Sequence, residues 1–226
     1  MVKTAVLVSG GGKNLQSLID ARMFGEIPDC ELTAVISSNP SAYALKRAEI
    51  AGLRRYIIDR EMFPSDSVFT SAVTDKLRDL DIELVILAGF DFPIPDAAFK
   101  YFEGRIISTG DGLMTQLSAR EVEDESLCAA ALEAGLKKVE ARAFFVTRES
   151  MENPIISQKF VEVQEDDSPR LRARLLEKGE NELLPKAVNL FCRGLLKLLD
   201  GKVINLSEKT DEGEGEKAEE KPCDKD

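Results

Sequence analysis

Apolar runs that suit buried strands alternate along this chain with helical patterns. Short continuous apolar runs are typical of parallel strands covered on both faces, and apolar residues spaced by three and four positions favour amphipathic helices. The expected strands are Thr4–Val8, Glu31–Ile36, Arg54–Ile58, Leu84–Leu87, Arg105–Ser108, Val139–Val146 and Ile155–Val163. The expected helices are Asn14–Ala21, Ala42–Ala51, Ser67–Leu80, Ser126–Leu136, Arg170–Glu177 and Leu183–Leu199. This alternation predicts an α/β fold with an open, mostly parallel twisted sheet and helices on both faces.

The apolar pattern stops after Leu206. Residues Ser207–Asp226 hold nine acidic residues and four lysines and have no apolar periodicity. Such a segment does not bury enough surface to offset the entropy of ordering. The sequence therefore predicts one α/β domain over residues 1–206 and an acidic disordered tail over residues 207–226. A solubilising role suits this tail better than a specific docking role.

The charge balance narrows the classes of partner. The chain of 226 residues carries 30 basic and 41 acidic side chains, a net charge of −11. A surface this acidic repels nucleic acid and anionic lipid, so we expect neither as a partner. No apolar stretch is long enough to span a bilayer and no leader pattern precedes the first strand, which favours a cytoplasmic protein.

The four cysteines indicate neither a metal site nor a disulfide framework. They are Cys30, Cys128, Cys192 and Cys223, they lie far apart, and no C-x-x-C pair occurs. Zinc sites and disulfide-rich domains use closer and more regular spacings. We expect reduced thiols and no bound metal.

The strongest local motif is S-G-G-G-K-N-L-Q at Ser9–Gln16, between the first expected strand and the first expected helix. Glycines there let backbone amides approach an anion, and the helix N-terminus adds partial positive charge. We predict that Gly11, Gly12, Lys13 and Asn14 bind a phosphate. The motif matches neither the P-loop nor the dinucleotide fingerprint. A plain connecting turn is the alternative, but open parallel sheets bind ligands at such strand ends.

Several motifs together resemble phosphoribosylglycinamide formyltransferase, the purine-synthesis family that moves a formyl group from 10-formyltetrahydrofolate to glycinamide ribonucleotide. The resemblance runs from Val2 to about Leu199. Besides the glycine loop, it rests on V-I-L-A-G-F at Val85–Phe90, A-L-E-A-G at Ala131–Gly135, F-F-V-T at Phe144–Thr147 and the segment Asn153–Ile156.

The resemblance implies a ligand set and a cofactor. It implies that Gly12 and Asn14 contact the ligand phosphate, that Lys13 replaces a serine there, and that Glu180 contacts the glycinamide part. It further implies a ligand-binding segment made of Leu87, Ala88, Gly89 and Phe90. The implied partner is a small phosphorylated compound, and the implied cofactor is 10-formyltetrahydrofolate.

The chain departs from the family where the family does its chemistry, and it contains no histidine at all. Ser108 and Gly110 stand at the asparagine and histidine of the family's N-x-H-P-S-L-L, Met151 at its aspartate, and Phe144 at a second histidine. An imidazolium with an amide donor stabilises negative charge on the formyl oxygen as the amine attacks. Glycine and methionine do not, so these replacements argue against formyl transfer, and we assign no catalytic residue.

The expected folate side is altered as well. Asp91 and Phe92 follow A-G-F where family members continue with methionine and arginine, and Asp66 replaces a family arginine. Because folate is polyanionic, added acids weaken its binding. The cofactor therefore rests on the resemblance alone.

Other acids offer a replacement for the missing groups. Asp111 lies between two glycines nearest the altered site, and Glu149 and Glu152 lie on the loop that carries the family's aspartate. Paired carboxylates divide acid and base roles when their pKa values separate. The alternative is that these are turn residues and solvated charges. Ser108 has no histidine or lysine partner in the sequence pattern that would make it a nucleophile.

Two functions of different class follow. One is a phosphoribosyl-binding or nucleotide-binding relative with little or no formyl transfer, acting as a sensor, regulator or subunit of an assembly. The other is an enzyme, either a formyltransferase or a transferase that acts on a phosphoribosyl substrate with an acid such as Asp111. A scaffold with an empty pocket is a third option. The sequence leaves the oligomeric state open.

Overall fold

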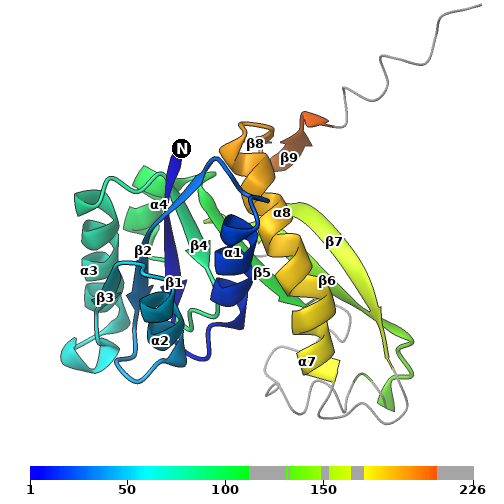
Figure 1. The fold of residues 1–226 in the computed structure, drawn as a ribbon, viewed down its shortest axis with the longest axis horizontal. Coiled ribbons are helices and arrows are strands. Elements are labelled where there is room, and N and C mark those ends of the chain that lie inside the picture. Colours follow the sequence, from blue (N-terminus) through cyan, green and yellow to red (C-terminus); the bar gives the residue numbers. More distant parts are fainter. Residues whose placement is uncertain (112–130, 132, 149–152, 164–170, 208–226) are drawn as a thin grey trace, which may run out of the picture.

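The computed structural model describes residues 1–111, 131, 133–148, 153–163 and 171–207 (Figure 1). Its centre is a seven-stranded sheet in the order β3-β2-β1-β4-β5-β6-β7. The strands are β1 (Val2–Val8), β2 (Cys30–Ser37), β3 (Arg55–Ile57), β4 (Leu84–Leu87), β5 (Ile106–Asp111), β6 (Lys138–Phe145) and β7 (Ile155–Glu162). Strands β1 to β5 pair in parallel, and β6 and β7 add to the edge antiparallel. The predicted mostly parallel sheet is confirmed.

Helices cover both faces of this sheet. The described helices are α1 (Lys13–Met23), α2 (Tyr43–Ile50), α3 (Asp66–Asp79), α4 (Asp96–Phe102), α7 (Leu171–Leu175) and α8 (Asn181–Cys192), with the short turns η1 (Arg60–Met62) and η2 (Leu176–Glu180). In β1, Val6 and Val8 pack with α1, α2 and α8, whereas Ala5 and Leu7 pack with α3 and α4. Successive side chains of a strand point to opposite faces. This alternation explains why β1 is buried on both faces from Thr4 to Val8.

The direction of the strand order reverses between β1 and β4, the two central strands. Their register places Leu7 opposite Leu87, so both strands end at the same edge of the sheet. The next residues remain joined, since the Ser9 amide donates to the Gly89 carbonyl at 2.8 Å. Open α/β sheets bind ligands at such a reversal, outside the carboxyl ends of the strands. The glycine loop after β1 lies at this point.

The predicted helix Leu183–Leu199 is wrong in its second half. Helix α8 ends at Cys192, and the chain continues into a hairpin of β8 (Leu196–Leu199) and β9 (Lys202–Asn205). Gly194 ends the helix at φ +70°, where its amide and that of Leu195 donate to the carbonyls of Phe191 and Leu190. This pair of bonds is a Schellman motif, which glycine favours because it lacks a Cβ.

The remaining elements differ less from those predicted from the sequence. The helix α4 was not predicted, although it follows Pro95 with the acidic first-turn residue Asp96, as many helices do. Helix α7 and turn η2 cover the predicted helix Arg170–Glu177 and extend it to Glu180, while Arg170 lies outside the described residues. Most of the predicted helix Ser126–Leu136 also lies outside them.

Candidate functional site

The glycine loop between β1 and α1 is pressed against α2. Gly12 has φ +70°, and a Cβ at this position would lie 2.6 Å from the Ala44 Cβ and 2.8 Å from the Ala44 Cα. The Ala44 amide donates to the Gly10 carbonyl at 3.1 Å. Both the left-handed backbone and the close approach require glycine at position 12.

Arg47 holds the outer side of the loop. Its Nε donates to the Gly11 carbonyl at 2.9 Å, and its guanidinium also donates to Gln16 Oε1 at 3.0 Å. Among the described residues, no side chain caps the start of α1, where Gly12 is the N-cap residue. The amide groups of the first turn therefore face the loop without a side-chain acceptor, which is the arrangement that binds anions.

A cavity of about 360 Å³ opens beside this loop. The loop Gly10–Asn14 forms one side, Ala88 and Gly89 after β4 form another, and Thr109 and Glu180 approach from β5 and η2. Three strand ends thus surround one space. The amides and a lysine offer positive charge at the loop, and the carboxylates of Asp91 and Glu180 also line the cavity.

Lys13 is the basic side chain of the cavity lining. It is half-exposed, and its Nζ lies 3.7 Å from the Glu177 Oε1. An exposed ion pair at this distance is weak. This weak pairing leaves the ammonium group available to another anion.

Asn14, Thr109 and Glu180 form a closed triangle of hydrogen bonds. Asn14 Nδ2 donates to Thr109 Oγ1 and to Glu180 Oε2, both at 3.0 Å, and Thr109 Oγ1 lies 3.0 Å from the same Glu180 oxygen. Asn14 is 7% exposed and Glu180 is 2% exposed. Residues from the first helix, the fifth strand and the C-terminal helical segment thus meet in one cluster, in which Asn14 and Glu180 are buried and Thr109 is partly buried.

Turn η2 brings Glu180 into this cluster. It is a single π-helical turn between α7 and α8, and such turns occur often at functional sites. Gly179, buried in this turn, packs so closely on β6 that a Cβ there would lie 2.3 Å from the Ala141 Cβ. The missing side chain at Gly179 therefore allows the backbone next to Glu180 to lie directly on the sheet.

Comparison with known proteins gives the family. Residues 2–188 match the family described as formyl transferase. The chain belongs to the formyl transferase family. It is 31% identical over 211 residues to phosphoribosylglycinamide formyltransferase of Haemophilus influenzae, covering 90% of this chain and 96% of that protein.

Two solved structures agree with this membership. Glycinamide ribonucleotide transformylase 1 from Symbiobacterium toebii has a TM-score of 0.81 and 32% identity, covering 91% of this chain and 94% of that one. The phosphoribosylglycinamide formyltransferase from Coxiella burnetii, solved in complex with CHES, has a TM-score of 0.79 and 29% identity, covering 91% and 93%. The family resemblance predicted from the sequence motifs is thereby confirmed.

In this member of the formyl transferase family, the side chains at Gly110 and at the neighbouring Phe144 offer no polar group at the end of β5. Gly110 pairs with Arg142 and Ser108 with Phe144 across the antiparallel ladder to β6. A Cβ at Gly110 would lie 3.6 Å from the Phe144 ring, and Ser108 Oγ donates to the Leu87 carbonyl at 3.3 Å. An oxyanion requires a fixed donor or cation near the reacting carbon. Gly110 and Phe144 supply no such group.

The predicted replacement acids lie at the end of the described residues or outside them. Asp111 is the last residue of β5 and pairs with Ala141. Glu149, Met151 and Glu152 lie outside the described residues. The candidate carboxylates therefore remain predictions from the sequence.

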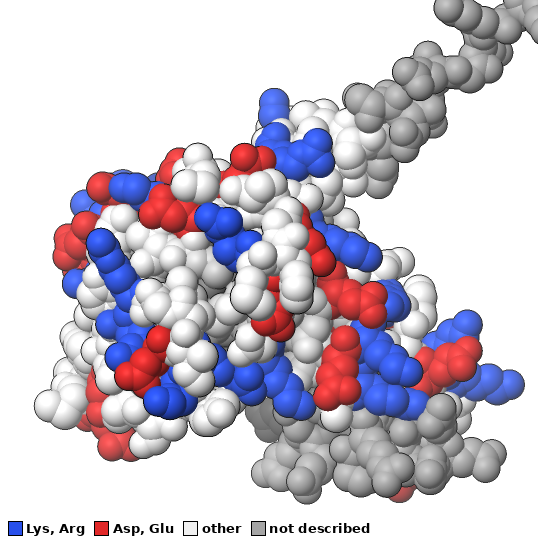
Figure 2. Space-filling view, viewed as in Figure 1, with Lys and Arg blue, Asp and Glu red and all other residues white. Residues whose placement is uncertain are grey.

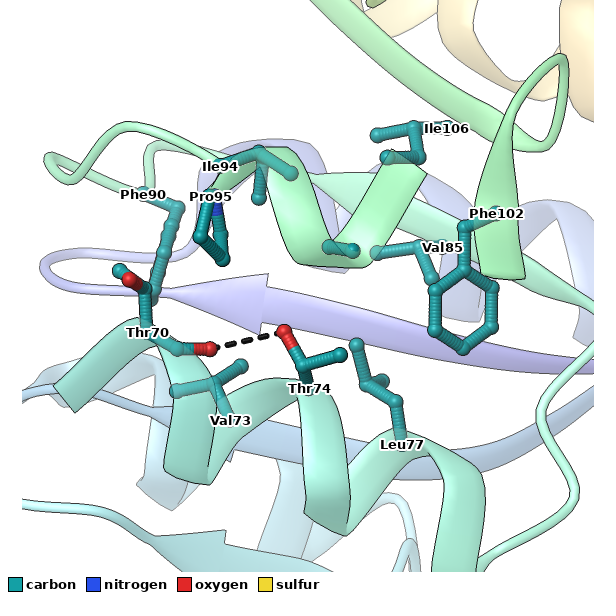
Figure 3. A pocket seen from close by; sticks show the side chains of 11 residues that line it. Thr70, Val73, Thr74, Leu77, Val85, Phe90, Ile94, Pro95, Phe102 and Ile106 are labelled. Carbon is teal, nitrogen blue, oxygen red and sulfur yellow. Dashed lines mark hydrogen bonds between the residues drawn. The ribbon is translucent and has the colours of Figure 1, made fainter. Parts of the chain in front are cut away.

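The segment Leu87–Phe90 divides between two environments. Ala88 and Gly89 line the main cavity, whereas Leu87 and Phe90 do not. The Phe90 ring instead stacks on Phe69, with centroids 6.1 Å apart. Figure 3 shows Phe90 at one end of a small apolar cavity of about 10 Å³ between α3 and α4. This space is too small for a ligand, and its lining is core packing.

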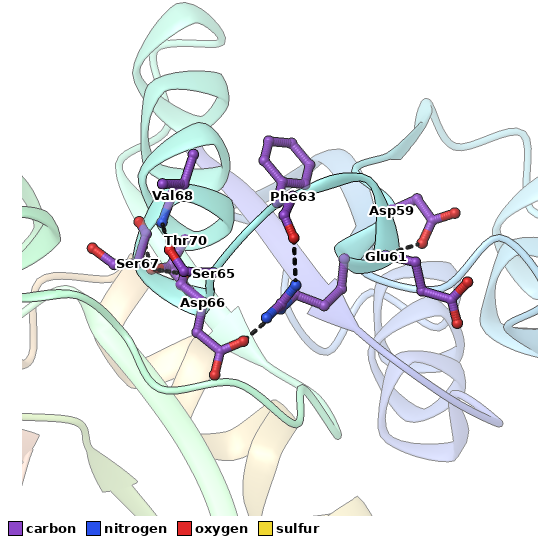
Figure 4. Close-up of polar contacts among 9 residues, drawn as sticks. Asp59, Glu61, Phe63, Ser65, Asp66, Ser67, Val68 and Thr70 are labelled. Atoms are coloured by element: carbon purple, nitrogen blue, oxygen red, sulfur yellow. Dashed lines mark hydrogen bonds and ion pairs between the residues drawn. The ribbon is translucent and has the colours of Figure 1, made fainter.

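A second cavity of about 360 Å³ lies at the ends of β2 and β3 and shares Asp91 with the first. Arg60, which lines it, bonds to Asp66 Oδ1 at 2.5 Å and to the Phe63 carbonyl at 2.9 Å (Figure 4). The acid predicted to disfavour folate, Asp66, is thus paired with an arginine. Asp59, Glu61 and Asp91 add further acids to this cavity.

Thr109 is the residue of this site that sequence reasoning missed. It was visible only as the neighbour of Ser108, and its hydroxyl points to the opposite side of β5, toward Glu180. The available signal was a polar residue directly after the expected strand Arg105–Ser108, whose centre is the apolar pair Ile106 and Ile107. Such positions often face a binding crevice.

Charges and thiols elsewhere give no competing site. Acidic and basic side chains intermingle over the face shown in Figure 2. Within the described residues no group of three acidic or cysteine side chains suits a metal, and no helix is both long and apolar enough to cross a membrane. Of the cysteines, Cys30 and Cys192 are described and both are free. A hydrogen bond with Cys30, together with burial, raises the pKa of the Cys192 thiol, which therefore stays protonated.

Proposed function

We propose that this chain binds a phosphoribosyl compound at the loop Gly10–Asn14 and carries out little or no formyl transfer. The observation that carries the proposal is the cavity in which uncapped α1 amides and Lys13 face the hydrogen-bonded cluster of Asn14, Thr109 and Glu180. The first group suits a phosphate, and the second suits a hydroxyl or amine. A phosphoribosyl compound carries both.

The weak transfer activity follows from the end of β5. The whole chain lacks histidine, and Ser108 and Gly110 stand where the family motif has asparagine and histidine. Loss of one oxyanion donor typically lowers kcat by about 10² to 10³. Residues that act as a unit are not additive, so the loss of the set is not the product of single losses. A sensor, a regulator or a subunit of an assembly would need only the binding step.

Calorimetric titration with ribose 5-phosphate tests the binding. We expect Lys13→Glu to weaken the affinity at least about tenfold, because it replaces an ammonium group beside the phosphate with a carboxylate. The matched control is Lys197→Glu, the same charge change at an exposed position of β8. Absence of binding to the unaltered chain, or equal weakening by both variants, would contradict the proposal.

Formyl transfer to glycinamide ribonucleotide is the second candidate, because the chain is similar to proteins named phosphoribosylglycinamide formyltransferase. We expect the purified chain, supplied with 10-formyltetrahydrofolate, to turn over at least about a hundredfold more slowly than such a relative. We also expect no rescue of a purine auxotroph that lacks its own formyltransferase. Robust rescue would favour the second candidate, and loss of that activity in Asp111→Asn would identify the replacement acid.

A further inference from the structure

The Asn14 side chain has one polar atom that the fold leaves without a partner. Both of its amide N–H groups are used, one by Thr109 and one by Glu180. Its Oδ1 is buried, and no donor in the described part of the chain reaches it. Exchanging the amide N and O would place Oδ1 against the Glu180 carboxylate, so the hydrogen bonds fix the orientation. Because Asn14 lines the cavity, this unpartnered acceptor belongs to the cavity wall.

Thr109 is the rigid member of this cluster. Its backbone pairs with Ala143 of β6, and its strand also pairs with β4. Its hydroxyl accepts a hydrogen bond from Asn14 Nδ2 and donates its own proton to Glu180 Oε2. Threonine is β-branched and has few rotamers, and β5 is held on both sides by neighbouring strands, so this hydroxyl moves little. Thr109 thus fixes the positions of the two longer side chains.

The internal hydrogen bonds use the donors of the cluster and leave one acceptor, Asn14 Oδ1, without a partner among the described residues. The two N–H groups of Asn14 and the hydroxyl proton of Thr109 all point to oxygens within the cluster. A ligand that enters here must supply its own N–H or O–H, because a buried acceptor without a donor is costly. A second anionic group would be repelled by the Glu180 carboxylate.

We propose that Thr109 is a specificity-determining positioning residue, which holds Asn14 Oδ1 in place to accept a hydrogen bond from the ligand and fixes the Glu180 carboxylate beside it. The ligand class is a phosphate ester that bears a hydroxyl or amine close to its phosphate. This inference rests on the proposed phosphate binding at the loop, and it adds the requirement for a donor group.

The test compares two probes and two variants. The probes are ribose 5-phosphate, which carries hydroxyl donors, and inorganic phosphate, which lacks the sugar. Thr109→Val keeps the shape of the side chain and removes the hydroxyl, whereas Thr109→Ser keeps the hydroxyl. We expect Thr109→Val to weaken ribose 5-phosphate about tenfold or more and inorganic phosphate less than about twofold. Thr109→Ser should recover most of the affinity for ribose 5-phosphate.

The outcomes separate the two proposals. If neither probe binds the unaltered chain, the proposed function fails, and this inference fails with it. If ribose 5-phosphate binds and Thr109→Val leaves its affinity unchanged, the positioning role is overturned while the proposed function stands. Equal weakening of both probes by Thr109→Val, without recovery in Thr109→Ser, would mean a purely structural role and would also overturn it. Melting temperatures of the variants identify any that fail to fold.

Discussion

At the scale of single residues, Gly12 determines the shape of the loop. A side chain at this position would be strained by the positive φ and would also clash with Ala44. The neighbouring Gly10 and Gly11 are open, since a Cβ at either meets nothing within 4 Å. The sequence shows three glycines of equal appearance, and only the packing of α2 distinguishes them.

Gly12→Ala should destabilise the fold and impair binding. We expect the free energy of unfolding, measured with urea, to fall by about 1 to 3 kcal/mol, because alanine disfavours this backbone region. The affinity for ribose 5-phosphate should fall as well, since the loop must move away from Ala44. Gly11→Ala is the matched control and should change stability little. If the two variants behaved alike, the contact with Ala44 would not be what constrains the loop.

At the scale of elements, the packing of η2 on β6 sets the position of Glu180. Gly179 and Ala141 approach so closely that there is no room for another methyl group. An irregular helical turn of this kind is not readable from apolar periodicity. The sequence pattern therefore predicted helices on each side of the turn without predicting the turn itself.

Gly179→Ala should displace η2 from the sheet. We expect a loss of about 1 to 3 kcal/mol in unfolding free energy, which is typical of overpacking in a core. Binding of ribose 5-phosphate should weaken because Glu180 moves. The double variant Gly179→Ala with Ala141→Gly removes the opposing methyl group and should recover part of both losses. A double variant no better than Gly179→Ala would contradict the steric explanation.

The C-terminal hairpin shows where pattern reading failed among the elements. The run G-L-L-K-L-L-D-G-K-V from Gly194 to Val203 contains a helix-ending glycine and an Asp-Gly turn. Asp200 and Gly201 both have positive φ, as a two-residue hairpin turn requires. The apolar residues were instead read as a continuation of the helix, because a short dense apolar run does not reveal its period.

At the scale of the whole molecule, local features were predictable and long-range ones were not. The sheet class, the glycine loop and most element positions follow from neighbouring residues. The contacts of Asn14 with Thr109 and Glu180 span 95 and 166 positions. No spacing rule joins residues so far apart, and only the family resemblance brought Glu180 into consideration. Thr109 had no such resemblance to mark it and emerged from the structure.

The distance along the chain between Asn14 and Glu180 has a consequence for synthesis and quality control. The loop emerges from the ribosome early, but its carboxylate partner arrives only with the last helical segment of the domain. A growing or truncated chain would therefore contain the glycine loop but lack the Glu180 carboxylate, which is proposed to face the non-phosphate part of the ligand. Ligand would therefore stabilise only chains that are long enough to include η2 and that have packed it against the glycine loop.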